Sequence, residues 1–197
     1  MVFKKYKVLN RQLSDYENKV YKNWLSSAEE KTKVGLEQPL VKRNKWKRKG
    51  LLKVNFSKSA MEVLTEVLYI KKFFPSRKIP PTLEDTFKRF HEFRNYINML
   101  DSIVDLYNYL RTTTTDVERN LIMPEMTKLD EKVKKAETIL NWNSENLLEY
   151  IEELLMEVES INRRVREAQD NVIKIYKEIS TFEDKPLFTR IKIRYDE

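Results

Sequence analysis

Cysteine is absent from the 197 residues, and only two glycines and one histidine occur. Without cysteine the chain has no disulfide, thiolate nucleophile, zinc finger or iron–sulfur cluster. Two glycines are too few for many hairpin turns or glycine-rich phosphate loops, which argues against a many-stranded barrel, a Rossmann unit and a P-loop NTPase. A single histidine, His91, cannot form a multi-histidine metal site on its own.

Long hydrophobic runs are also missing. No stretch of 18 apolar residues exists, so we expect no membrane-spanning helix. The first residues, Met1-Val-Phe-Lys-Lys-Tyr-Lys-Val8, are basic but lack the apolar core of a signal peptide. We therefore expect an intracellular protein.

The composition that remains is 35% charged and 41% hydrophobic, which is typical of long amphipathic helices. The net charge of +7 is divided unevenly between two parts of the chain. Residues 1–54 carry 15 basic and 5 acidic side chains, whereas residues 55–197 carry 23 basic and 26 acidic ones. The basic character therefore belongs to the N-terminal part.

The strongest basic cluster lies between the two glycines, in a segment that also contains Pro39 and that we interpret as a linker or loop. It predicts a solvated linker, a nuclear-targeting or nucleic-acid-binding arm, or a contact with an acidic protein or anionic surface. Its candidate partner-binding residues are Lys42, Arg43, Lys45, Trp46, Lys47, Arg48 and Lys49.

Helical spacing organises most of the remaining sequence. We predict an extended start followed by a helix over 14–33, and a helix that is capped by Asn55 or Ser57 and stopped by Pro75. A third helix is expected to begin at a Thr82 cap and reach Arg111, before a run of four threonines.

A fourth helix is predicted from Val117 to about Leu140, with Asp116 as its cap and a kink or short first turn at Pro124. The next joint covers residues 141–144, where Asn143 or Ser144 would cap the last helix. After Phe182, residues with period two could form a short strand or an extended exit.

The last predicted helix carries apolar residues in alternating steps of four and three from Leu147 to Phe182. This 3.5-residue repeat keeps one narrow seam facing a partner helix. The seam either packs within this chain or pairs with another chain. Its candidate residues are Ile151, Leu154, Val158, Ile161, Val165, Val172 and Ile175.

These patterns predict an all-α fold, an elongated bundle of about four long antiparallel helices with a basic N-terminal arm. We place the arm, with one short helix and a linker, at residues 1–54 and the helical bundle at residues 55–197. The oligomeric state is left open.

Catalytic chemistry has little support in the sequence. His91 is expected to be a solvated or packing residue, and carboxylate pairs such as Glu152 and Glu153 are ordinary on a charged helix face. A di-iron bundle would need a Glu-x-x-His motif, and none is present, because Lys88 stands three residues before the histidine. We expect no catalytic residue, no cofactor and no metal.

Several short stretches in order, from about residue 38 onward, resemble the N-terminal tail region of dynein heavy chains, most closely the axonemal ones. Departures from the family pattern are Asn120, where proline is usual, and the 74–77 turn, which often carries glycine; they argue against assigning an isoform. The matching stretches include Leu52-Lys-Val-Asn-Phe-Ser57, Tyr96-Ile-Asn-Met-Leu-Asp101, Val117-Glu-Arg-Asn-Leu-Ile122, Ile139-Leu-Asn-Trp-Asn-Ser144 and Lys185-Pro-Leu-Phe-Thr-Arg190.

The resemblance implies a non-catalytic tail segment, without the ATPase motor, that is either a fragment of a heavy chain or a motorless relative. It implies assembly and docking in the axoneme of a cilium or flagellum, with heavy, intermediate and light chains as partners. The basic cluster would be a candidate contact with a neighbouring subunit or with the microtubule. The alternatives are an independent helical adaptor and a nucleic-acid or anionic-surface binder, although nucleic acid is the less favoured partner.

Overall fold

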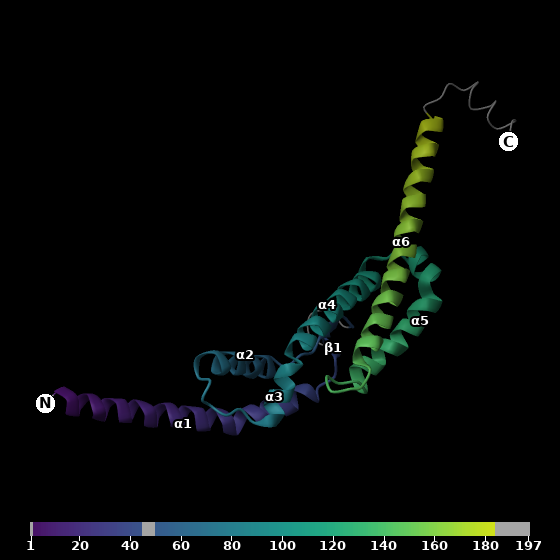
Figure 1. Cartoon of the computed structure of the whole chain (residues 1–197). Coiled ribbons are helices and arrows are strands. Elements are labelled where there is room, and N and C mark those ends of the chain that lie inside the picture. Colours follow the sequence, from purple (N-terminus) through teal and green to yellow (C-terminus); the bar gives the residue numbers. More distant parts are fainter. Residues whose placement is uncertain (1, 45–49, 184–197) are drawn as a thin grey trace.

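A computed structural model describes residues 2–44 and 50–183, and in this part of the chain six helices and one two-stranded sheet are found. The predicted all-α class is confirmed. The molecule is elongated, with the first and last helices extending away from a central bundle in different directions (Figure 1). The expected strand or extended exit after Phe182 lies outside the described residues.

The first helix, α1 (Val2–Leu36), is much longer than predicted, and the expected extended start is wrong. It runs antiparallel to α2 (Lys58–Phe73), whose start lies beside the end of α1. At that crossing a Cβ on Gly35 would lie 2.6 Å from the Cβ of Ala60, so only glycine allows this approach. Ser57 caps α2 as predicted, and the helix ends just before Pro75.

The predicted helix over residues 82–111 is in fact two helices, α3 (Pro81–Lys88) and α4 (Phe90–Thr113). They meet at Arg89, whose φ of −84° and ψ of 0° lie in the bridge region, outside the α-helical range. The expected Thr82 cap is also wrong, because Pro80 precedes the helix and Pro81 is its first residue. Proline suits this position since the first helical N–H has no partner within the helix.

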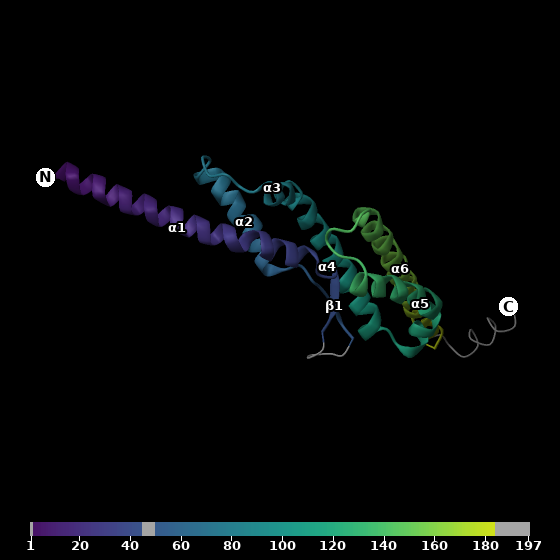
Figure 2. The same ribbon diagram turned by 90° about the horizontal axis from the view of Figure 1, so that it is seen from below.

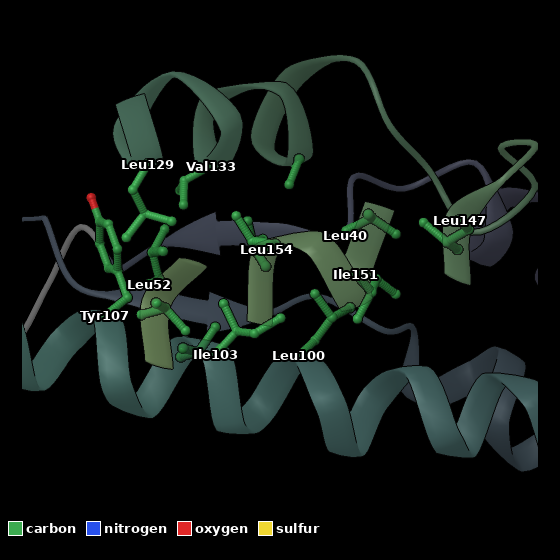
Figure 3. Close-up of a cluster of buried hydrophobic side chains, with 14 of the residues drawn as sticks. Leu40, Leu52, Leu100, Ile103, Tyr107, Leu129, Val133, Leu147, Ile151 and Leu154 are labelled. Atoms are coloured by element: carbon green, nitrogen blue, oxygen red, sulfur yellow. The ribbon is translucent and has the colours of Figure 1, made fainter. Parts of the chain in front are cut away.

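Helices α4, α5 (Asp116–Thr138) and α6 (Leu147–Glu183) form the central bundle. Neighbours in sequence run antiparallel, as predicted. Figure 3 shows the core between them, where Leu100 and Ile103 of α4 face Ile151 and Leu154 of α6. Because these side chains are almost fully buried, each contributes about 1.5–3 kcal/mol through its removal from water.

A complete capping box begins α5. Thr115, not the predicted Asp116, is the N-cap residue, and its backbone N–H donates to the Glu118 carboxylate at 2.6 Å. This bond, followed by those from the Gln169 amide and the Thr115 hydroxyl, lowers the pKa of Glu118. The helix continues across Pro124, so a short first turn ending at this proline is not formed.

A small hairpin joins the α1–α2 pair to the bundle. Strand β1 (Val41–Arg43) pairs antiparallel with β2 (Leu52–Val54), and Val41 lies opposite Val54. Gly50, with φ of 101°, occupies a conformation that other residues rarely adopt. Buried side chains on both sides of the expected boundary at residue 54, such as Leu40 and Leu100, belong to one core.

The joint between α5 and α6 is more than a turn. Trp142 is completely buried, its indole N–H donates to the Asn55 carbonyl oxygen at 3.1 Å, and its ring meets Phe56 edge-on. The residues predicted as helix caps, Asn143 and Ser144, hydrogen-bond within the joint instead, and α6 begins three residues after Ser144.

Candidate protein-binding surfaces

The basic cluster lies at the hairpin. Lys42 is exposed and stands directly opposite the exposed Lys53 on the neighbouring strand, so the hairpin presents two adjacent cations. Like charges that face each other across strands repel, which makes an anionic partner favourable here. Lys53 was not among the predicted site residues. Five of the predicted ones lie outside the described residues: Lys45, Trp46, Lys47, Arg48 and Lys49.

Arg43 makes contacts with the body of the protein. Its guanidinium pairs with Glu137 of α5 at 3.0 Å and donates to the Gly50 carbonyl oxygen at 3.0 Å. On the other side of the hairpin, the Asn108 amide of α4 exchanges two hydrogen bonds with the backbone of Leu52. The hairpin is therefore fixed to both α4 and α5, which holds its exposed lysines in a defined orientation.

The predicted seam of α6 divides into two halves with different surroundings. The inner half packs within this chain, where its residues contact the α4–α5 side of the core. The outer half is exposed: Val172 is 51% and Ile175 is 53% accessible. The buried residues of the inner half are Leu147, Ile151, Leu154, Val158, Ile161 and Val165.

Polar contacts between α5 and α6 lie at both ends of the part of α6 that the bundle covers. Near the start of α6, Lys132 of α5 pairs with Glu153 and Glu157 at 2.6 Å each. In the same region of α6, burial raises the pKa of the Tyr150 hydroxyl to about 12. Near the α4–α5 turn, the Gln169 amide donates to Glu118 at 2.7 Å. Beyond it, the side chains of residues 170–181 are all exposed, and Figure 1 shows this part of α6 projecting from the bundle.

A second exposed apolar stripe, on α1, was missed by the sequence analysis. The signal was present, because its members recur in steps of three and four, but the extended start assigned to residues 1–13 interrupted it. The stripe continues toward Trp24, where α1 becomes covered by α2. Figure 2 shows that α1 extends well beyond the end of α2. Its exposed residues are Tyr6, Leu9, Leu13, Tyr16 and Val20.

The described residues offer no site typical of catalysis. His91 is exposed at the start of α4, and no group of three or more histidine, aspartate or glutamate side chains in residues 2–44 and 50–183 is placed to hold a metal ion. None of the helices in these ranges combines the length and apolar character needed to cross a bilayer. The surfaces that stand out are thus the two projecting helix ends and the lysines of the hairpin.

Comparison with known proteins supports a single family. Residues 1–150 match the family model described as dynein heavy chain, N-terminal region 1. The chain is 34% identical to the ciliary dynein beta chain of Tripneustes gratilla over 98% of its own length and 4% of that protein's. It is likewise 34% identical to mouse dynein axonemal heavy chain 17 and pig dynein axonemal heavy chain 11, over 96% of this chain. It therefore spans only about 4% of the length of these relatives.

Proposed function

Because the chain belongs to the dynein heavy chain family, within its N-terminal region, we propose that it is a non-catalytic tail segment that assembles and docks a ciliary or flagellar motor complex. Its partners are then other heavy chains and the intermediate or light chains, and its location is the axoneme. ATP hydrolysis is left to other parts of such proteins, since neither Gly35 nor Gly50 stands in a P-loop motif.

The observation that carries this proposal is the projecting end of α6. Five large apolar side chains are exposed on it, although the same seam is buried one helical turn after another inside the bundle. Large exposed apolar patches usually mark interaction sites. The five residues are Val172, Ile173, Ile175, Tyr176 and Ile179.

The width of this face suggests what covers it. At about 100° per residue, the five side chains span roughly 160° of the helix circumference, which is wider than a two-stranded coiled-coil seam. Inside the bundle the corresponding face of α6 contacts two helices, α4 and α5. A docking partner that supplies helices to the projecting end would continue the same packing.

Co-purification tests the proposal. The tagged full chain is expressed in ciliated cells, and the captured proteins are probed for dynein heavy, intermediate and light chains. We expect these subunits to be recovered with the wild-type chain and lost with the pair Ile175→Asp and Ile179→Asp. Lys177→Asp is the matched control, because it changes the net charge by the same two units as the pair does, but on the polar side of the same turn.

Two other outcomes would contradict the proposal. Recovery of unrelated proteins without any dynein subunit would indicate an independent helical adaptor. Binding of RNA or anionic vesicles that weakens steeply with salt, with no dynein subunit captured, would indicate a nucleic-acid or surface binder, because phosphate contacts release counterions.

The basic cluster has a separate role in the proposal, as a contact with an acidic face of a neighbouring subunit or of the microtubule. Its support is the fixed hairpin, which presents Lys42 and Lys53 side by side. Replacing Lys42, Lys45 and Lys47 with glutamate should weaken microtubule co-sedimentation at low salt. If co-sedimentation is unchanged, this contact is not made.

A further inference from the structure

A groove lies between α1 and α2, next to the point where α1 projects beyond its partner. Its volume is about 350 Å³, and its surface is largely aromatic. Tyr21 and Trp24 stack along one side, with ring centroids 5.8 Å apart. The apolar lining consists of Tyr16, Val20, Trp24, Tyr69, Ile70 and Phe74.

Two carboxylates and one guanidinium also line the groove. Glu66 accepts a hydrogen bond from the Trp24 indole N–H at 2.6 Å, and Glu17 lies one turn before Tyr21 on α1. The Arg77 guanidinium lies over the Tyr21 ring, 5.1 Å from its centroid, and donates to Asn18. The aromatic faces thus already hold one cation, as ring quadrupoles favour. The charges on the lining leave one carboxylate in excess.

We propose that this groove binds an amphipathic helix of a partner protein, with apolar side chains on the aromatic rings and a lysine or arginine beside Glu17 and Glu66. The inference rests on the proposed function only in taking the occupant to be a protein. The exposed stripe on α1 leads into the groove through Leu13 and Tyr16. A partner helix fits because a straight apolar stripe along one helix is a surface on which another amphipathic helix packs.

The charge of the groove also distinguishes this occupant from a second copy of the chain. In a twofold contact the same patch meets itself, so the Glu17 and Glu66 carboxylates of one copy would face those of the other. A basic helix has the opposite charge, and each cation that it places against an aromatic face gains attraction beyond simple burial.

Fluorescence anisotropy of three labelled model peptides tests the proposal. Each peptide is a leucine-containing amphipathic helix of about 18 residues, or five turns, whose polar positions are all lysine, all glutamine or all glutamate. We expect the lysine peptide to bind the full chain, the glutamine peptide to bind at least about fivefold more weakly, and the glutamate peptide more weakly still, as one cation–π or ion-pair contact of about 1 kcal/mol implies.

Matched variants separate the groove from general attraction between basic peptides and acidic surfaces. Tyr16→Ser and Glu17→Gln should each weaken binding of the lysine peptide about fivefold. The control, Asp15→Asn, changes an exposed carboxylate of the same helix that lies outside the groove and the apolar stripe, and should leave binding unchanged. Because Tyr16 is 66% exposed, its replacement does not threaten folding.

Three results would overturn the inference. The first is that the three peptides bind with equal affinity. The second is that Asp15→Asn weakens binding as much as the groove variants do. The third is that the chain self-associates in sedimentation and Tyr16→Ser abolishes this association. If the peptide assay fails while dynein subunits are still captured by the wild-type chain, only the groove is refuted. If capture fails while the lysine peptide binds as described, only the assembly role is refuted.

Discussion

The two halves of the α6 seam allow one substitution to be tested in two environments on one helix. Val158 is 0% exposed in the core, whereas Ile175 is 53% exposed beyond it, and both lie on the same heptad stripe. We therefore expect Val158→Asp to unfold the bundle and Ile175→Asp to leave it folded.

The magnitudes follow from burial. Val158→Asp removes about 1.5–3 kcal/mol of hydrophobic burial and places a carboxylate in the core, where an unpaired ion costs several kcal/mol more. The total is comparable with the 5–15 kcal/mol that stabilises a typical domain. At Ile175 half of the side chain already contacts water and a carboxylate stays hydrated, so we expect a loss of about 1 kcal/mol or less.

Circular dichroism at 222 nm, followed through a thermal melt, measures both effects. Val158→Asp should lose its cooperative transition or have a Tm lower by ten degrees or more, since 1 kcal/mol shifts the Tm of a chain of this size by about 2–4 °C. Val158→Ala, which removes methyl groups without adding charge, should fall between this variant and the wild type. The reasoning is refuted if Val158→Asp melts like the wild type, or if Ile175→Asp is equally damaging.

Three further predictions concern single contacts. Gly35→Ala should destabilise the chain by about 1–3 kcal/mol in urea unfolding, although alanine favours helices, because its Cβ would lie 2.6 Å from a Cβ of α2; a gain in stability would contradict that close approach. Glu118→Gln should flatten the pH dependence of stability: the native pKa is lowered, chiefly by the Thr115 N–H, so this stabilisation is complete above the unfolded pKa and is lost as the pH falls through it toward the native value. Equal acid sensitivity in urea titrations at pH 7 and pH 3 would refute this linkage. Trp142→Phe should cost about 2–4 kcal/mol by losing ring volume and leaving the Asn55 carbonyl without its donor, and an unchanged urea midpoint would count against that contact.

Much of the helical architecture could be predicted because its boundaries have local chemical causes. Ser57 at the start of α2, Pro75 after its end and the threonine run in which α4 ends act through residues close in sequence. The division at Arg89 has no such signal, since arginine favours helices and the apolar stripe continues across it. Periodicity therefore predicted one helix where there are two.

Long-range contacts were the part that sequence reasoning could not reach. The sequence placed Trp142 in a joint between helices, yet its side chain is completely buried in the core. Its indole N–H donates to a carbonyl oxygen 87 positions earlier in the chain, a contact that no local pattern indicates. Periodicity likewise predicted which face of α6 is apolar without indicating how much of that face the chain itself covers. Coverage depends on the length of the neighbouring helices, which is a property of the tertiary structure.

Helix lengths explain why the end of α6 keeps apolar surface exposed, and burial of that surface would drive the proposed assembly. Helix α6 has 37 residues, but its bundle partners α4 and α5 have 24 and 23, so its last turns extend about 20 Å past the α4–α5 turn at 1.5 Å per residue. The core orients this overhang, and the overhang holds exposed apolar surface that the proposed partner would bury. Core and overhang substitutions should therefore impair assembly differently: Val158→Asp by lowering Tm, and Ile175→Asp with little change in Tm. A docking defect without a change in Tm is thus the signature expected of the interface itself.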